Sequence, residues 1–216
     1  MDDKEWLIYT DLIEKDKDAR SLEMELCKRD PLHWLYTWCW TLDSHDPIHK
    51  IKRFPEKKYI RKITELWLTE ERLLIEKSRQ MMISWWFMAL NLWDCMFHEG
   101  RLSIIQSKKE KDANKLILRA WFIFKRLPNW MKPKHNFTYC NLIFPEIESE
   151  ILGIPQGEDT ARMHTASRFT MDEMAFQTQA EGAYTAAKPT IDGGGKFLGV
   201  SSANPSFFEL LVNDKI

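Results

Sequence analysis

The feature that most constrains the fold is a strand, a polar turn and a long apolar helix in direct succession. The run RLLIE at Arg72–Glu76 is short and apolar enough for a buried strand, and the apolar stretch from Ser84 to Phe97 is long enough for a helix. Gly100 provides a helix end, and the run LSIIQ at 102–106 predicts a second buried strand. Because strands alternate with helices, the sequence favours an α/β fold with a largely parallel sheet.

Further elements follow from apolar spacing and turn chemistry. We expect one or two helices within 4–29, and others from Pro31, at 59–67, at 108–127 and at about 180–187. We expect strands at 168–171, at 197–200 and twice within 137–154, where Pro145 separates them. We expect loops at 43–56, 153–165 and 193–195, where proline, glycine and polar residues gather.

The composition is that of an ordinary folded domain. The 216 residues are 44% hydrophobic and 29% charged, which suits one large domain or one domain with a small appended subdomain. We place a helical and aromatic segment at 1–58 and a core domain at 59–216. Most of the ten tryptophans and twelve phenylalanines are expected in the core, and a surface for partners is the alternative.

Charge, cysteine content and the N-terminus argue against several classes of protein. The formal net charge of −1 gives no general attraction to nucleic acid, so any DNA contact has to come from a local basic patch. The four cysteines are far apart and the six histidines form no metal-ligand spacing, which favours reduced, buried thiols over structural zinc. The acidic N-terminus precedes no apolar signal region, and no apolar run approaches about 18 residues, so we expect neither secretion nor a membrane span.

A candidate phosphate-binding loop connects the first strand to the apolar helix. It reads KSRQMMIS from Lys77 to Ser84. A turn in this position directs backbone N–H groups and the helix N-terminus at an anion, and the hydroxyl of Ser84 can ligate Mg²⁺. The loop lacks the glycines of GxxxxGK[ST] and has no lysine before Ser84, so a charged strand-to-helix turn is the alternative. The long side chain of Lys77 can reach the β- and γ-phosphates from the first position of a curled loop.

Two more polar motifs follow predicted strands. Asp172 and Glu173 end the strand at 168–171, where the first acid suits Mg²⁺ and the second suits activation of a water molecule. Two buried acids without a counter-ion are costly, and a bound cation would relieve that cost. Ser201–Asn204 follows the strand at 197–200, where small polar residues can sense a γ-phosphate. A surface turn explains each motif taken alone.

The order of the three motifs is more informative than any one of them. Each follows a predicted strand, and parallel sheets bind ligands at the carboxyl ends of their strands. The strand at 102–106 falls between the first and second motifs along the chain. This is the arrangement of NTPases with an additional strand and a catalytic glutamate.

In these motifs the chain resembles the large terminase subunit of tailed bacteriophages and related viruses. Many members have a loop similar to Lys-Ser-Arg-Gln-x-Gly-x-Ser, which 77–84 match except at Met82. The segments 153–157 and 171–176, with Thr165 between them, are similar to the family's run into its acidic motif, and 201–204 resemble its coupling motif. The resemblance covers about residues 50–210. It implies a three-layer P-loop NTPase of the additional-strand, catalytic-glutamate type, with a mostly parallel central sheet and an N-terminal helical extension.

The resemblance implies an ATP hydrolase that uses ATP and Mg²⁺, and it assigns roles to residues of the three motifs. The implied roles are phosphate binding by Lys77 and Arg79, Mg²⁺ binding by Ser84 and Asp172, and polarisation of the attacking water by Glu173. The implied nucleotide contacts are Lys77, Ser78, Arg79, Gln80, Met81, Met82, Ile83, Ser84 and Asn204.

An arginine acting in trans is also implied. Arg162 lies eleven residues before Glu173, where similar proteins place an arginine that enters the neighbouring subunit's site. Arg168 competes for this role, and a solvated loop arginine is the alternative for Arg162. Such an arginine stabilises the charge on the transferring phosphoryl group and raises the rate by roughly 10³–10⁵.

Two departures from the family pattern concern nucleotide affinity. Phe54 and Tyr59 occupy the region expected to contact adenine, but no glutamine lies between Lys50 and Lys77. The aromatic run at 34–40 either contributes there or belongs to the core. Met82 replaces the loop glycine, and its Cβ restricts the backbone where it approaches phosphate, so we expect weak ATP binding by the isolated domain.

The implied partners are double-stranded DNA, the portal protein and the small terminase subunit, in the host cell cytoplasm. The motor would form a homo-oligomeric ring during packaging and be a monomer when isolated. The family's nuclease domain is expected beyond Ile216 and is absent from this sequence. Basic residues at 108, 109 and 111 either face DNA or form a solvated helix start. Two further alternatives are a degenerate domain that docks partners or merely binds nucleotide, and a helicase-like translocase.

Overall fold

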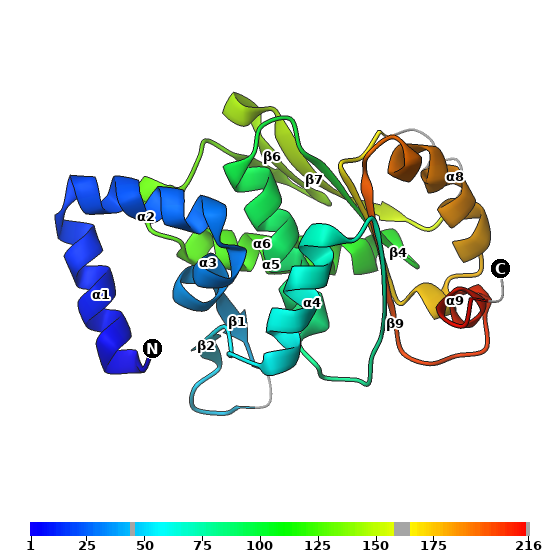
Figure 1. Cartoon of the computed structure of the whole chain (residues 1–216), viewed down its shortest axis with the longest axis horizontal. Helices are drawn as coiled ribbons and strands as arrows, with labels where there is room; N and C mark the ends of the chain where they lie inside the picture. The colour runs from blue at the N-terminus through cyan, green and yellow to red at the C-terminus, as the bar shows by residue number, and fades with distance from the viewer. Residues whose placement is uncertain (44–45, 158–164, 215–216) are drawn as a thin grey trace.

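The protein is built on a mixed seven-stranded sheet, seen in a computed structural model that describes residues 1–43, 46–157 and 165–214 (Figure 1). The strands, in spatial order, are β3 (Arg72–Glu76), β9 (Lys196–Ser201), β8 (Arg168–Asp172), β4 (Leu102–Ser107), β7 (Ser149–Pro155), β6 (Asn141–Phe144) and β5 (Asn136–Thr138). The pairs from β3 to β7 are parallel, and β6 and β5 are added antiparallel. The strand that separates β3 from β8 is β9, whereas β4 lies on the far side of β8.

Helices cover both faces of this sheet. The helices that follow the N-terminal region are α4 (Lys58–Thr69), α5 (Ile83–Phe97), α6 (Glu110–Arg126), α8 (Ala180–Asp192) and α9 (Phe207–Val212). Ile105 of β4 packs in a large apolar cluster with α5 and α6, while its neighbour Ile104 packs in a second cluster with α8. Because successive strand residues point to opposite faces, the two clusters lie on opposite sides of the sheet. The three-layer α/β fold expected from the sequence is confirmed.

The N-terminal region is a chain of three helices at one end of the molecule, opposite α8 and α9 (Figure 1). They are α1 (Asp3–Lys15), α2 (Lys17–Arg29) and α3 (Pro31–Trp38). Each begins after an aspartate, Asp2, Asp16 or Asp30, whose carboxylate accepts hydrogen bonds from the first backbone N–H groups of the helix. These caps satisfy N–H groups that have no partner within the helix, which explains why the chain turns sharply twice without glycine.

The expected loop at 43–56 is wrong in part, because a β-hairpin occupies this region. Strand β1 (Trp40–Leu42) pairs antiparallel with β2 (Ile51–Arg53). Pro47 and Pro55 flank the second strand and do not interrupt it, so they mark the ends of the strand and not the absence of one.

Three other boundaries differ from expectation. The segment 137–154 contains parts of three strands, because β5 and β6 are joined by a tight turn in which Cys140 has φ +57°, without the usual Gly or Asn signal. The expected loop from 153 begins later, since Gly153 and Ile154 belong to β7. Helix α8 continues through Pro189 to Asp192, and α9 was not expected at all. The short 3₁₀ turns are η1 (Asn129–Met131), η2 (Pro145–Ile147) and η3 (Met174–Phe176).

The aromatic and sulfur-containing side chains are mainly internal. All ten tryptophans are buried or half-buried, and the four cysteines are buried free thiols, as the sequence predicted. Within the described ranges, no helix combines the length and the apolar character needed to cross a membrane.

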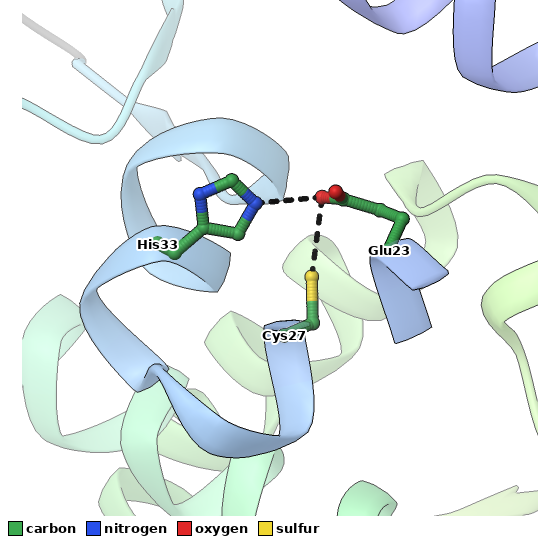
Figure 2. A group of neighbouring side chains, drawn as sticks. All are labelled: Glu23, Cys27 and His33. Carbon is green, nitrogen blue, oxygen red and sulfur yellow. Dashed lines mark hydrogen bonds and ion pairs between the residues drawn. The ribbon is translucent and has the colours of Figure 1, made fainter. Parts of the chain in front are cut away.

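The N-terminal helices are joined by a buried carboxylate, that of Glu23 on α2, which is 3% exposed. Its Oε1 contacts His33 Nε2 at 2.7 Å and accepts a longer bond from the Cys27 thiol at 3.4 Å (Figure 2). The same oxygen accepts from the indole N–H of Trp38 at 2.6 Å. Its Oε2 accepts from the Tyr9 hydroxyl at 2.5 Å. Burial acts to raise the pKa of Glu23, but the hydrogen bonds from His33, Tyr9 and Trp38 outweigh it and lower the pKa.

Glu23, Cys27 and His33 also offer three ligand-type atoms within 4.8 Å of one another. The contacts favour a structural role. The Trp38 N–H already donates to the carboxylate and cannot ligate a metal, and burial raises the pKa of the Cys27 thiol, whereas a metal ligand has to be the thiolate. The carbonyl of Cys27 accepts from the Trp93 indole at 2.7 Å, which links α2 to α5 in the core.

Replacing Glu23 with Gln should destabilise the fold by about 2–4 kcal/mol at pH 7, because an amide cannot accept all four donors. Since the folded state lowers the pKa of Glu23, its stabilisation is present above the ordinary glutamate pKa of 4.5 and is lost as pH falls through the folded value. Urea unfolding at pH 7 and at about pH 4 measures this, and the difference between variant and wild type should shrink at the lower pH. Glu25→Gln, on the exposed face of α2, is the matched control; equal losses for the two variants would contradict the role of Glu23.

Candidate nucleotide-binding site

The structure brings together an ammonium group and a carboxylate that are 96 residues apart in the chain. Lys77 follows β3, Glu173 follows β8, and Lys77 Nζ lies 3.0 Å from Glu173 Oε1. The Lys77 side chain is 9% exposed, and its backbone N–H donates to the carbonyl of Ser201 at the end of β9. The ends of three parallel strands therefore meet at one edge of the sheet, as the order of the motifs predicted, although only Lys77 of these residues lines the cavity described below.

The loop between β3 and α5 has the geometry of an anion-binding turn. Gln80 and Met82 have φ +63° and +58°, so the backbone curls through the left-handed region twice. The Tyr59 hydroxyl donates to the carbonyl of Met81 at 2.9 Å and holds the loop against α4. Within the described chain, no side chain caps the N-terminus of α5, and the N–H groups of its first turn remain available to a ligand.

This loop forms one wall of a cavity of about 720 Å³. Gln80, Met81, Met82, Ile83 and Ser84 line it together with Lys77. Residues of the β1–β2 hairpin and its flanks line the cavity too, as do Trp85 and Arg119. A volume of about 300–1,000 Å³ is typical of sites for ligands of nucleotide size. A larger cavity of about 830 Å³ lies near α1, but none of the described residues with a predicted role in phosphate or metal binding lines it.

Asp172 is a half-buried acid with one carboxylate oxygen shielded from solvent. Its Oδ1 atom is shielded from solvent and has no hydrogen-bond partner among the described residues. Burial and the neighbouring Glu173 raise the pKa of Asp172 to about 6, although Arg119 and Lys77 act in the opposite direction. A buried, unbonded carboxylate oxygen fits a hard divalent cation, and the Ser84 hydroxyl at the start of α5 would supply a second oxygen ligand.

Glu173 lies at a strained turn that the buried side-chain amides of Gln106 and Gln177 hold in place. Its φ is +50°, a conformation that costs an L-residue of order 1–3 kcal/mol and is found at functional sites. Its Oε2 accepts from the Ser202 hydroxyl at 3.4 Å. Gln177 donates to the carbonyl of Asp172 at 2.9 Å, and Gln106 donates to the Gln177 side chain at 2.8 Å. Neither glutamine was predicted from the sequence. For Gln106, the available signal was its position as the polar residue that ends the apolar run LSIIQ.

Several predicted contact residues lie apart from the cavity. Ser78 and Arg79 are exposed and are not among the described residues that line it. Neither Phe54 nor Tyr59 is among those lining residues: Phe54 is 2% exposed, packs in the core and lines the larger cavity near α1, and Tyr59 donates to the carbonyl of Met81. The Asn204 amide donates to the carbonyl of Ala175 at 3.1 Å. The adenine-contacting role of Phe54 and Tyr59 and the phosphate-sensing role of Asn204 stay predictions.

Of the two arginines considered for action in trans, Arg162 lies outside the described residues. Arg168 is 9% exposed, at the opposite end of β8 from Glu173. Its guanidinium pairs with Asp94 at 2.9 Å and lies 3.4 Å from the centre of the Trp67 ring. A guanidinium enclosed in this way cannot reach a neighbouring subunit, so Arg168 no longer competes with Arg162.

Comparisons with known proteins rest on structure. No protein-family model and no curated protein sequence matches the chain. Among solved structures, it is similar to the ATPase domain of the large terminase of Thermus phage P74-26, with TM-score 0.61 and 17% identity over 72% of this chain and 68% of that one. It is also similar to the large terminase of bacteriophage HK97, with TM-score 0.67 and 10% identity over 87% of this chain and 40% of that one.

A third similar structure is the large terminase of a thermophilic bacteriophage in complex with ADP, with TM-score 0.54 and 12% identity over 68% of this chain and 39% of that one. The chain thus spans less than half the length of these last two proteins. At these identities the likeness defines the fold. The chain has the fold of the ATPase domains of phage large terminases, as its three motifs had indicated.

Proposed function

We propose that this chain is the ATPase motor domain of a viral large terminase, which hydrolyses ATP to move double-stranded DNA into a procapsid. The observation that carries the proposal is the 3.0 Å contact between Lys77 and Glu173, at the mouth of a loop that ends in the uncapped N-terminus of α5. This contact joins a candidate general base to a phosphate-binding cation that lines the cavity.

The arrangement suits attack of water on a terminal phosphate. Lys77 would exchange Glu173 for the β- and γ-phosphates, which the N–H groups of α5 also approach. Glu173 would take a proton from water as the water oxygen bonds to the γ-phosphorus and the bond to the β-phosphate oxygen breaks. Ser84 and Asp172 would hold Mg²⁺, which when bound neutralises charge on the phosphates.

The similar terminase from the thermophilic bacteriophage contains ADP, which supports a nucleotide as the ligand of this cavity. Double-stranded DNA, the portal protein and the small terminase subunit belong to the proposal as partners, and Arg162 of one subunit would complete the site of the next in a ring. These parts of the proposal draw their support from the shared fold.

A degenerate domain that docks partners without turnover is the competing proposal, because Met82 replaces the loop glycine. The charged groups favour hydrolysis. A docking domain has no use for a shielded Asp172 oxygen without a hydrogen-bond partner beside a second acid on a strained turn, since both features destabilise the fold.

Replacing Glu173 with Gln should lower the rate of ATP hydrolysis by about 100-fold or more, because the amide cannot accept a proton from water. The affinity for ATP should be kept or slightly raised, since Lys77 loses its charged partner. Phosphate release and calorimetric titration measure the two effects. Glu181→Gln, an exposed acid on α8, is the control, and turnover that survives in the Glu173 variant would remove its role as base.

Replacing Asp172 with Asn should stabilise the protein at pH 7.5 in the absence of Mg²⁺ and nucleotide. The folded pKa of about 6 lies above the ordinary value of 3.8, so the ionised group destabilises the fold by up to about 3 kcal/mol above pH 6. Wild-type stability should therefore rise as pH falls from 7 towards 5, and the variant should lack this rise.

Thermal unfolding of wild type and of Asp172→Asn between pH 5 and 8 measures both the stabilisation by the substitution and the pH dependence of wild-type stability. Asp192→Asn, at an exposed position paired with Arg72, should not stabilise the protein. An unstable Asp172 variant would show that this carboxylate is neutralised within the fold.

Replacing Met82 with Gly should tighten binding of a slowly hydrolysed ATP analogue by about 3–10-fold, because the backbone can then approach phosphate without a Cβ in the left-handed region. Thermal stability should change little, since relief of strain and the added freedom of the unfolded chain oppose each other. Met82→Ala keeps the Cβ and should not tighten binding. Equal gains for the two variants would attribute the effect to the bulk of the methionine side chain.

A further inference from the structure

Four cations line the cavity among the described residues, and three of them are already paired. Lys77 contacts Glu173 at 3.0 Å, Lys52 contacts Asp46 at 2.8 Å, and Arg53 contacts Asp3 at 2.7 Å. The fourth is Arg119 of α6, which makes neither an ion pair nor a hydrogen bond within the part of the chain that the structure describes. The N–H donors of the Arg119 guanidinium therefore lie at the cavity without an anionic partner among the described residues.

The position of Arg119 follows from the packing of α6. Residues such as Leu116, Ala120 and Ile123 bury one face of the helix in the core, and Arg119 lies at the edge of that face, half-buried. Its guanidinium carbon is 5.8 Å from the centre of the Trp85 ring, and Trp85 belongs to the first turn of α5. The charge is thus placed beside the helix N-terminus that the phosphates would approach.

The Arg119 guanidinium has no ion-pair partner among the described residues, so an anion from outside the chain would stabilise its charge. Burial lowers the pKa of its guanidinium, which shows that the charged form is poorly hydrated, and Asp172 compensates only in part. Asp172 acts on Arg119 through its charge alone, since no ion pair or hydrogen bond joins the two side chains. A cation in this state is stabilised by an anion that enters the cavity, and phosphate oxygens match the planar fork of a guanidinium.

We propose that Arg119 is a phosphate-binding residue of the nucleotide site, acting in cis from α6 while Lys77 acts from the end of β3. This inference rests on the proposed function and adds a residue to its site. The two cations come from different elements and line the same cavity as the α5 N-terminus, so the phosphates would contact both. Because the guanidinium presents two parallel N–H donors, it would fix the orientation of the phosphate group as well as attract it.

The test compares Arg119→Ala and Arg119→Lys with wild type in calorimetric titrations, using a slowly hydrolysed ATP analogue and inorganic tripolyphosphate with Mg²⁺. We expect Arg119→Ala to weaken both ligands by roughly tenfold or more, and Arg119→Lys by less, since lysine keeps the charge but not the fork. Circular dichroism and thermal unfolding verify that the variants are folded, and the lysine variant preserves the test if the alanine variant is unstable.

Arg126→Ala is the matched control. Arg126 lies two helical turns further along α6 on the same side, with its guanidinium carbon 3.5 Å from the centre of the Phe122 ring, and it is not among the described residues lining this cavity. It should leave both affinities unchanged. A comparable loss in Arg126→Ala would overturn the proposal by showing a general effect of charge on α6.

The remaining outcomes separate this inference from the proposed function. If wild type binds the ATP analogue and Arg119→Ala binds it equally well, the inference fails and the proposed function stands. If Arg119→Ala weakens the analogue but not tripolyphosphate, Arg119 contacts the nucleoside and the phosphate assignment is overturned. If wild type binds neither ligand, the proposed function fails, and the inference fails with it.

Discussion

The candidate site depends on the parallel order of three strands. Lys77 and Glu173 can meet only because β3, β9 and β8 run side by side in one direction and end at the same edge. The register fixes the height of each group, since Glu76 pairs with Ser201 and Asp172 pairs with Val200. The apolar clusters on both faces hold that register, because a shift of one residue would move each buried side chain to the opposite face, into a cluster packed for other side chains.

The same edge concentrates features that oppose stability. Asp172 carries a buried, unbonded carboxylate oxygen, Arg119 a guanidinium with no ion pair among the described residues, and Met82 and Glu173 lie in the left-handed region. Each costs free energy, and the cores on the two faces of the sheet offset that cost. The missing partners of these groups are of two kinds, a cation for the acid and an anion for the guanidinium. A metal–polyphosphate complex supplies both charges together, which explains why the groups gather at one place.

The three motifs were predictable from sequence because each follows an apolar strand, and parallel sheets gather strand ends at one edge. Other parts were not. The turn at Cys140 adopts φ +57° without Gly or Asn, so β5 and β6 read as one strand. Arg119 had no signal, because helical spacing places it at the border of the apolar face, and only the tertiary packing of α6 against α5 turns it to the cavity. Likewise, Gln106 and Gln177 are 71 residues apart and form a pair only in the folded chain.

The β1–β2 hairpin connects the cavity to the N-terminal helices. Arg53 lines the cavity, pairs with Asp3 at 2.7 Å, and has its guanidinium carbon 5.6 Å from the centre of the Trp6 ring on α1. Trp6 packs edge-on against Trp40 of β1 at 5.3 Å between ring centres. Because Arg53 touches both the cavity and α1, the hairpin cannot move relative to the loop at 77–84 without breaking these contacts or carrying α1 with it. The first helix is therefore coupled to the cavity through Arg53, although none of the described residues of α1 lines the cavity.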